Sequence, residues 1–445
     1  MYFKKKIGRF NLLNKTLLIP EMSKMLTHLC AACLRSFGIN AKALETCNDT
    51  ALELGKEYTS GKECYPCQIT MGDILYFLKK EKKRLKENFD IEQYLYLMPE
   101  TAGPCRFGMY NKYQHIVFNS FPEFARLKIV SLSANDAYSF DGMIKKKKVA
   151  AIRKAAFIAL VAADILDRLL MRIRPYEKKA GDADRFISKA QNILSEAFEN
   201  HAASGNFNFI FKKLEQIAAN GKKLIDPSIP PKPLVGIVGE IYLRSHERSN
   251  QNLIKNLEKQ GAETVNASIA EWVNFTSYKE LKNAEQEVRL NLSSFKIKPI
   301  ADNMKNILKY GKIFFYQKYK QKRIYNRAVK FLNIAQDHNV KDFDDIIKER
   351  KLFTLDIGTE ACLSIPGALS YAEHGFNGVV NVYPFTCMPS IITSAIVKPL
   401  MSKMRMPYLD ASYDSTYQPS RETAIRTFMY QVKRHFKKQG RCVLK

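Results

Sequence analysis

The stretch that decides the fold of this chain is Ile225-Asp-Pro-Ser-Ile-Pro-Pro-Lys-Pro-Leu234-Val-Gly-Ile-Val238. Four prolines in seven residues cannot continue a helix, so this stretch predicts a linker over residues 225–234. The apolar run from Leu234 to Val238 is typical of a buried strand. The linker therefore divides the 445 residues into two parts, as expected for a chain longer than one hydrophobic core usually serves.

Both parts alternate short apolar runs with helical patterns. In the first part, a run ended by Pro20 precedes a helical pattern from Lys24 to Phe37, and a second helix is expected over about 66–87. In the second part, a helix is expected from Asn252 to Gln260, with Gly261 placed to cap it. The strands that these patterns predict are Thr16–Ile19, Gln114–Phe118, Lys128–Leu132, Leu234–Val238 and Gly378–Tyr383.

The segment from about Lys145 to Lys223, just before the linker, is almost wholly helical in pattern. We therefore expect an α/β protein with two lobes that contain short parallel sheets, together with a helical insert. The predicted boundaries are an N-terminal α/β lobe over 1–144, the helical insert over 145–224, the linker over 225–234 and a C-terminal α/β lobe over 235–445.

Composition limits the classes of function. Lys and Arg outnumber Asp and Glu by 71 to 44, a net charge of +27 that would attract nucleic acid, an anionic membrane or a polyphosphate-bearing substrate. The basic residues are strewn along the chain, which does not favour nucleic-acid binding. The longest apolar stretch, Ala155 to Met171, is interrupted by Asp164, Asp167 and Arg168, so no membrane span is expected.

Cysteine usage is the main chemical signal. The basic N-terminus is not followed by the apolar region of a signal peptide, so we expect a cytoplasmic protein. Its nine cysteines are then thiols, metal ligands or catalytic groups rather than a disulfide framework.

Three cysteines share an unusual local context. Gly61-Lys-Glu-Cys64-Tyr-Pro66-Cys67 and Phe385-Thr-Cys387-Met-Pro389 each place Cys-x-Pro directly before a helical pattern, and Gly103-Pro-Cys105-Arg-Phe-Gly108 is a sharply punctuated loop. A helix N-terminus favours the thiolate that binds metal. Cys64, Cys105 and Cys387 would suit an iron–sulfur cubane in a cleft between the lobes, although any single cysteine of this kind is more often an isolated buried thiol.

A zinc site is an alternative interpretation. Cys30-Ala-Ala-Cys33 and Cys64-Tyr-Pro-Cys67 together supply two C-x2-C pairs, which could form a tetrahedral site. The spacing between the pairs is long, and Cys30 and Cys33 lie in an apolar helical pattern, so they are expected to be core residues. Cys47, Cys362 and Cys442 have no partner pattern.

No nucleotide-binding fingerprint is evident. Asp356-Ile-Gly-Thr-Glu360 is similar to the phosphate-binding loop of actin-like ATPases, but it stands alone near the end of the chain. Neither a P-loop nor a G-x-G-x-x-G motif occurs. We therefore expect no ATP hydrolysis by this chain.

Five segments together resemble a known family. They are Thr16-Leu-Leu-Ile-Pro-Glu-Met22, Gly61-Lys-Glu-Cys-Tyr-Pro-Cys67, Gly103-Pro-Cys-Arg-Phe-Gly108, Gly236-Ile-Val-Gly-Glu-Ile-Tyr-Leu-Arg244 and Tyr383-Pro-Phe-Thr-Cys-Met-Pro389. With them the chain resembles the 2-hydroxyacyl-CoA dehydratase superfamily over nearly its whole length. It is most similar to the dehydratase-like portion of the large CoA-substrate-specific enzyme activases, where that portion follows an ATPase module.

The resemblance implies a cofactor and its ligands. Dehydratase subunits of this family hold a [4Fe–4S] cluster through three cysteines on motifs of these types, which correspond to Cys64, Cys105 and Cys387. Some relatives carry a double-cubane cluster, for which Cys67 and then Cys30 and Cys33 would be further ligands. Each family subunit has two flavodoxin-like or Rossmann-like α/β lobes with a helical part.

Three classes of function stay open, and the resemblance implies several partners. The chain would be an electron-transferring Fe–S reductase component, an acyl-CoA dehydratase subunit (a lyase), or a zinc- or cluster-stabilised binding protein without redox chemistry. A separate ATPase activase would supply the electron in anaerobic metabolism, acyl-CoA is a candidate substrate, and a homo- or heterodimer is a candidate assembly.

Overall fold

The computed structural model of the protein describes residues 6–101, 103–133, 138–293 and 297–442. The first sheet has five parallel strands in the order β1-β5-β4-β2-β3. These strands are β1 (Ile7–Gly8), β2 (Thr16–Ile19), β3 (Asn40–Ala43), β4 (Tyr94–Leu97) and β5 (Lys128–Val130).

The second sheet begins directly after the proline-rich segment. Its four parallel strands have the order β7-β6-β8-β9. They are β6 (Leu234–Gly239), β7 (Glu263–Asn266), β8 (Gly378–Pro384) and β9 (Tyr408–Tyr413). The prediction of two α/β lobes with short parallel sheets is therefore confirmed.

The two sheets share one topology. Counted from β2 and from β6, both have the strand order 2-1-3-4, which is the flavodoxin-like order. Such sheets bind ligands beyond the carboxyl ends of their strands, where the chain reverses direction across the sheet. These points lie between β2 and β4 in the first lobe and between β6 and β8 in the second.

Helices surround both sheets. In the first lobe and the helical block they are α1 (Lys24–Ser36), α2 (Asp49–Glu57), α3 (Tyr65–Leu85), α4 (Tyr110–Asn119), α5 (Lys146–Ile173), α6 (Asp182–His201) and α7 (Asn208–Lys222). In the second lobe they are α8 (Ile241–Ser245), α9 (Leu253–Lys259), α10 (Ile269–Ser293), α11 (Ile297–Val329), α12 (Val340–Glu349), α13 (Ala361–Glu373), α14 (Met388–Lys403) and α15 (Ser420–Gln439).

One predicted strand is wrong. Residues 114–118 belong to α4, and the sheet uses Tyr94–Leu97 instead. Asn111, Gln114, His115 and Phe118 are all buried and follow the i, i+3, i+4, i+7 spacing of a helix face. The helix was hidden in the sequence because polar side chains occupy that face. They remain there because they have partners: Asn111 donates to Glu100 and Ser131, and Gln114 donates to Thr70.

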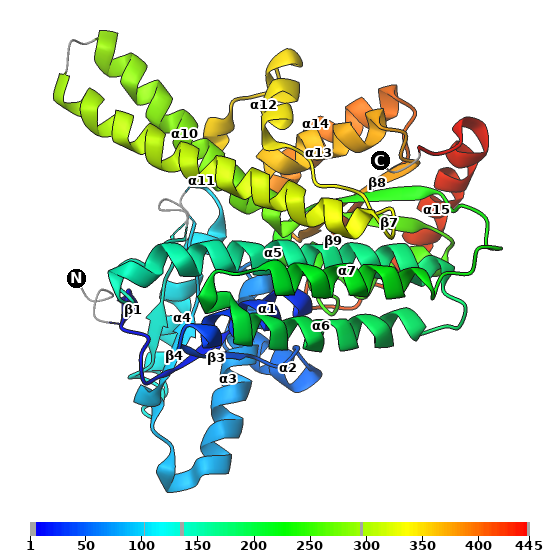
Figure 1. Ribbon diagram of the computed structural model, residues 1–445. Coiled ribbons are helices and arrows are strands. Elements are labelled where there is room, and N and C mark those ends of the chain that lie inside the picture. The colour runs from blue at the N-terminus through cyan, green and yellow to red at the C-terminus, as the bar shows by residue number, and fades with distance from the viewer. Residues whose placement is uncertain (1–5, 102, 134–137, 294–296, 443–445) are drawn as a thin grey trace.

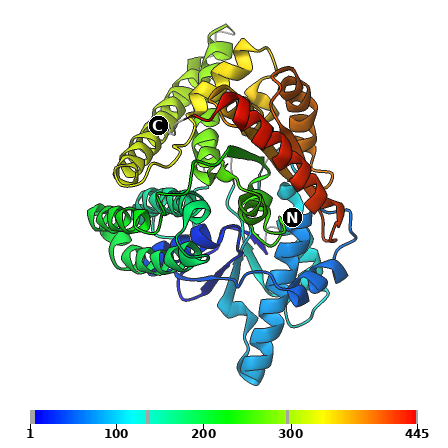
Figure 2. The ribbon, with the colours of Figure 1, turned by 90° about the vertical axis from the view of Figure 1, so that its right-hand side faces the viewer.

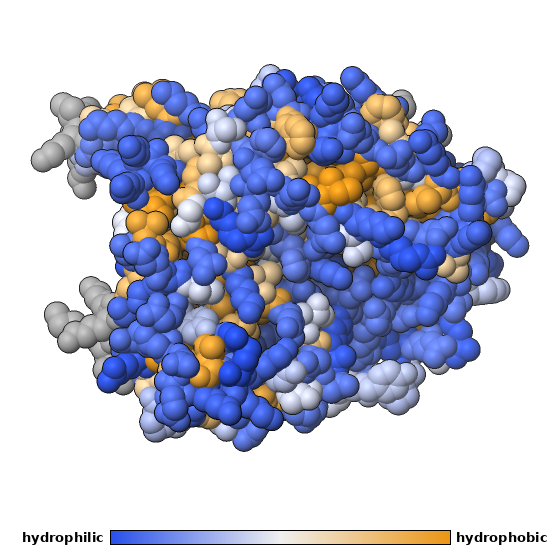
Figure 3. All heavy atoms as spheres, turned by 60° about the horizontal axis from the view of Figure 1, so that its bottom comes forward, coloured by the Kyte–Doolittle hydropathy of each residue, from blue (hydrophilic) through white to orange (hydrophobic). Residues whose placement is uncertain are grey.

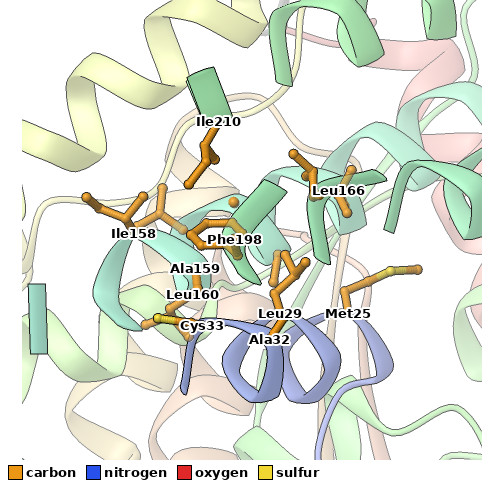
Figure 4. Packing of buried hydrophobic residues seen from close by; sticks show 14 of the residues in the cluster. Met25, Leu29, Ala32, Cys33, Ile158, Ala159, Leu160, Leu166, Phe198 and Ile210 are labelled. Carbon is orange, nitrogen blue, oxygen red and sulfur yellow. The ribbon is translucent and has the colours of Figure 1, made fainter. Parts of the chain in front are cut away.

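The helical block joins the two lobes. One hydrophobic cluster contains residues of α1, α5, α6 and α7 together with Leu17 of β2 and with Ile241, Ile269 and Ile324 of the second lobe. Figure 4 shows part of this packing, with Phe198 and Ile210 above Ala159 and Leu29. Figures 1 and 2 show the block (green) beside both lobes. It is therefore a shared layer rather than a peripheral insert.

Polar groups of α5 reinforce this joint. Asp164 accepts hydrogen bonds from the N–H groups of Ile269 (3.1 Å) and Ala270 (2.9 Å) and so caps α10. Arg168 forms a buried ion pair with Asp337 at 3.2 Å. The charges that interrupt the apolar stretch of α5 thus bind the second lobe.

The face of the molecule seen in Figure 3 is predominantly hydrophilic, with smaller apolar areas between the polar side chains. Across the described ranges, no helix is both long enough and apolar enough to span a membrane.

Helices α2 and α3 cross in close contact at Gly55 and Gly72, and this contact fixes the position of α3. Cys64 immediately precedes the first residue of α3. A Cβ at Gly72 would lie 1.9 Å from the carbonyl oxygen of Ala51, and one at Gly55 would lie 2.0 Å from that of Gln68. The backbones of α2 and α3 can approach this closely only because both residues lack a Cβ.

We predict that Gly72→Ala lowers the free energy of unfolding by about 2 kcal/mol or more, because the contacted atom is backbone and cannot turn away. Urea denaturation would measure this. Gly311→Ala, within α11, is the matched control. A Cβ at Gly311 would meet only the side chain of Leu281, at 4.0 Å. This substitution should be neutral or stabilise by up to about 1 kcal/mol through helix propensity. Equal effects of the two substitutions would contradict the proposed close crossing.

Candidate functional site

The three cysteines singled out in the sequence occupy equivalent positions. Cys64 precedes α3, Cys105 precedes a short 3₁₀ helix (Arg106–Met109) that leads into α4, and Cys387 precedes α14. Pro66 and Pro389 lie in the first turns of α3 and α14. The prediction that Cys64 and Cys387 lie at helix N-termini is therefore confirmed, and Cys105, expected on a loop, directly precedes a 3₁₀ helix.

The strands explain why these loops approach one another. Cys387 follows β8 after two residues, and the Cys105 loop follows β4, so both come from the carboxyl edges of their sheets. Each of these strands borders the reversal point of its sheet. Two separate lobes thus contribute cysteines from the positions where α/β sheets place their ligands.

One guanidinium connects all three loops. Arg106, next to Cys105, donates from one terminal nitrogen to the carbonyl of Lys62 at 2.9 Å. Its other terminal nitrogen donates to the carbonyl of Thr386 at 2.8 Å and to its hydroxyl at 3.0 Å. Thr386 has a φ of 62°, a left-handed conformation that is unfavourable for a β-branched residue. Arg106 therefore holds the Cys387 loop in a conformation that the loop alone would disfavour.

Two glutamates also lie at helix N-termini at this site. Glu240 directly follows β6 and accepts hydrogen bonds from the N–H groups of Tyr242 (3.1 Å) and Leu243 (2.8 Å) in α8. Glu360 precedes α13 and accepts one from the N–H of Ile241 at 3.4 Å. Burial, and then the charge of Glu240, raise the pKa of Glu360 to about 8.

The same two carboxylates act on all three thiols. Burial is the largest cause that raises the pKa of Cys64, Cys105 and Cys387, and the charges of Glu240 and Glu360 raise each of them further. Cys105 is also affected by the charge of Cys387. The structure therefore brings the three thiols around one pair of carboxylates.

Burial outweighs the helix N-termini in this protein. The pKa of Cys387 is raised to about 12, and Arg106 only partly opposes the rise for Cys64. The expected preference for the thiolate is thus not met without a metal. Metal binding would have to release the thiol protons, as it does at thiolate sites generally.

The other cysteines of the C-x2-C pairs lie apart from each other. Cys67 is buried one turn after Cys64, in a cluster that includes Leu18. Cys33 is buried in the other cluster, with Leu17, and packs beside Leu160 (Figure 4). Adjacent residues of a strand point to opposite faces, so the two pairs lie on opposite faces of the first sheet. This placement does not favour a four-thiol zinc site, and it confirms Cys33 as a core residue.

The donor set at the site consists of thiols, which are ligands of iron–sulfur clusters and of zinc alike. Three thiols at the site, with Cys67 one turn beyond Cys64, are the ligand type that such clusters use. Within the described parts of the chain, no group of three or more His, Cys, Asp or Glu side chains is arranged to hold a single metal ion.

Sequence reasoning missed the groups that organise the site. In the sequence, Arg106 is only a cation next to Cys105, and Glu360 is the last residue of the isolated Asp356–Glu360 motif. The segment at 355–357 is a 3₁₀ helix that no strand directly precedes in the described structure, unlike the loop of an actin-like ATPase. The sequence does contain one signal for Glu240. This residue follows a predicted buried strand and precedes a helical pattern, and carboxylates are favoured at helix N-termini.

A second group of buried polar side chains lies between the lobes. Thr46 donates to both carboxylate oxygens of Glu21 at 2.9 Å, and His246 Nε2 lies 3.9 Å from Glu21 Oε1. Neither oxygen of the buried Asp73 carboxylate accepts a hydrogen bond from an N–H or O–H group of the described residues, and the hydroxyl of Tyr242 is also unsatisfied. Burial raises the pKa of Asp73 to about 8, against an opposing interaction with the nearby thiol of Cys47.

This burial predicts a pH dependence. Between about pH 4 and 8 the unfolded chain releases the Asp73 proton while the folded chain retains it, so the free energy of unfolding falls as pH rises. Asp73→Asn should therefore become more stable relative to the wild type as pH rises, by on the order of 5 kcal/mol at pH 8. Urea denaturation at several pH values would measure the difference.

Asp90 provides a control of opposite sign. Its pKa is lowered by hydrogen bonds from the N–H of Glu92 (2.9 Å) and from Gln93 (3.1 Å). Asp90→Asn should lose stability relative to the wild type as pH rises from the acid range. A difference between Asp73→Asn and the wild type that does not change with pH would contradict the burial of an ionisable carboxyl.

A comparison with models of known protein families found no match, and a comparison with curated proteins also found none.

Proposed function

We propose that this protein binds a [4Fe–4S] cluster between its two lobes through Cys64, Cys105 and Cys387 and uses it for low-potential electron transfer. The supporting observation is the contact of Arg106 with the loops of the other two cysteines, at Lys62 and at Thr386. No packing requirement explains why loops 280 residues apart in sequence should share one guanidinium beside three thiols. The family that the sequence resembles supports the same ligands.

The residues of the site would have distinct roles. Cys64, Cys105 and Cys387 would bind iron after losing their protons, and the unpaired N–H groups of three helix N-termini would stabilise the added negative charge. Arg106 would keep the loops together. A bound cluster would supply transfer of single electrons at low potential. Cys67 is the first candidate for an additional ligand if the cluster is a double cubane.

Two other functions would use the same fold. An acyl-CoA dehydratase subunit would be a lyase that passes the electron to a bound thioester, and the net positive charge would suit the phosphates of CoA. A zinc-stabilised binding protein without redox chemistry is less favoured, because the two C-x2-C pairs lie on opposite faces of the first sheet. Oxygen sensitivity, colour and lyase activity would distinguish the three.

The proposed partner is a separate ATPase activase. The sequence has no nucleotide-binding fingerprint, so an electron driven by ATP hydrolysis would have to come from another protein. That activase would dock transiently, and a homo- or heterodimer with a dehydratase-like subunit is a further possible assembly.

We predict that protein purified without oxygen contains about four iron and four sulfide per chain, or about eight of each for a double cubane. Cys64→Ser, Cys105→Ser and Cys387→Ser should each lose most of the iron and the visible absorption, because two thiolates anchor a cubane poorly.

Cys362→Ser and Cys442→Ser are the matched controls. Cys362 is buried against the carbonyl of Leu355 at 3.8 Å, and Cys442 packs beside Gly375. Both variants should keep the full iron content. Wild-type protein that holds zinc but neither iron nor sulfide would overturn the proposal, and so would iron retained in all three site variants.

A further inference from the structure

Helix α11 carries an unusual concentration of charge. Between Asn303 and Arg327 it has eight basic residues and no acidic one. The basic residues are Lys305, Lys309, Lys312, Lys318, Lys320, Lys322, Arg323 and Arg327. In the part of the chain that the structure describes, Lys305 pairs with Asp302 and Arg327 pairs with Glu215, whereas Lys312, Lys318 and Lys322 are exposed without an ion pair.

A stripe of large apolar side chains runs along the exposed side of the same helix. Met304, Leu308, Phe315 and Tyr319 are 46%, 60%, 67% and 60% exposed. Their spacings of four, seven and four residues place them within about 60° of one another around the helix, since each residue advances by about 100°. From Met304 to Tyr319, fifteen steps of about 1.5 Å along the helix, the stripe is about 22 Å long.

The opposite side of α11 is already occupied. Ile313, Phe314, Gln317 and Ile324 are buried, and α11 packs against α10, α5 and α7. Figure 1 shows α10 and α11 as an antiparallel pair that projects from the rest of the molecule at its upper left. The apolar stripe therefore cannot be explained by packing within the protein, and only about half of the helix surface is open to a partner.

This open surface combines the two features of helices that lie on membranes. The exposed half carries the apolar stripe, and Lys312, Lys318 and Lys322 lie within or beside this stripe. The flexible side chains of these lysines can extend from there toward phosphate groups. A straight, half-embedded helix matches a flat partner better than a groove that encloses a helix. A second copy of the chain would be repelled, because it carries the same positive charge. A nucleic-acid backbone would offer no apolar contact for the four exposed side chains of the stripe.

We propose that α11 is a peripheral membrane-binding element that docks on bilayers rich in anionic phospholipids. The apolar stripe enters the boundary between headgroups and acyl chains, and the uncompensated lysines contact the lipid phosphates. The arm then holds the protein at the membrane surface without crossing it. This role is independent of the cluster.

Vesicle sedimentation with the full-length chain tests the proposal. Vesicles of phosphatidylcholine and phosphatidylglycerol in equal amounts should bind the protein at least tenfold more tightly than vesicles of phosphatidylcholine alone. Leu308→Ser/Phe315→Ser should weaken binding about tenfold or more through loss of the apolar contact. Lys312→Glu/Lys322→Glu should weaken it similarly and reduce its dependence on salt.

Matched substitutions elsewhere provide controls. Ile193→Ser/Tyr430→Ser removes two exposed apolar side chains on α6 and α15, and Lys83→Glu/Lys189→Glu reverses two exposed charges on α3 and α6. Both should bind anionic vesicles like the wild type, and circular dichroism should show all four variants folded.

Several outcomes would overturn the proposal. They are failure to bind anionic vesicles, equal binding to neutral vesicles, and equal losses in the control variants. Binding that depends on the lysines but not on Leu308 and Phe315 would indicate a general basic surface instead. A dimer of the wild type that Leu308→Ser/Phe315→Ser dissociates would assign the stripe to contact between two copies.

Discussion

The packing of α5 against both lobes is the interaction on which the rest of the structure depends. Its apolar residues form one cluster with α1, α6 and α7 on the first lobe and with Ile269 and Ile324 on the second. Burial of apolar side chains on this scale is the largest favourable contribution to folding. It is not directional, however, and would allow the lobes to slide. Asp164 at the N-terminus of α10 and Arg168 on Asp337 limit this freedom, because these hydrogen bonds and this ion pair form in only one arrangement of the lobes.

The candidate site follows from that arrangement. Each lobe is a parallel sheet whose carboxyl edge carries the loops that precede helix N-termini, and fixing the lobes brings these edges together. Thiols and carboxylates are then buried next to one another, and burial raises their pKa values by more than the nearby arginines lower them. With raised pKa values, the buried thiols keep their protons unless a metal displaces them. Under the proposed function, binding of an iron–sulfur cluster would replace the thiol protons with iron.

Arg106 illustrates how one residue serves both the fold and the site. Its hydrogen bonds go to backbone carbonyls at Lys62 and Thr386 rather than to carboxylates, so its charge remains available to the neighbouring thiols. Arginine is suited to this role because its planar group presents several donors in fixed directions. The same lobe geometry leaves α10 and α11 projecting, since α11 needs only one side for packing and its basic side stays open to solvent.

The sequence alone determined the class of fold and the nature of the candidate ligands. Proline clusters, apolar runs such as Leu234–Val238 and Cys-x-Pro before helical patterns are local signals, because backbone conformation there depends on neighbouring residues. Only the tertiary structure decided that 114–118 is helical, that Cys33 and Cys67 lie on opposite faces of a sheet, and that Glu240, Glu360 and Arg106 organise the site. These features depend on contacts between residues far apart in the chain, where burial and partner groups override local preference. No local pattern records which carbonyl a guanidinium will meet 280 residues away.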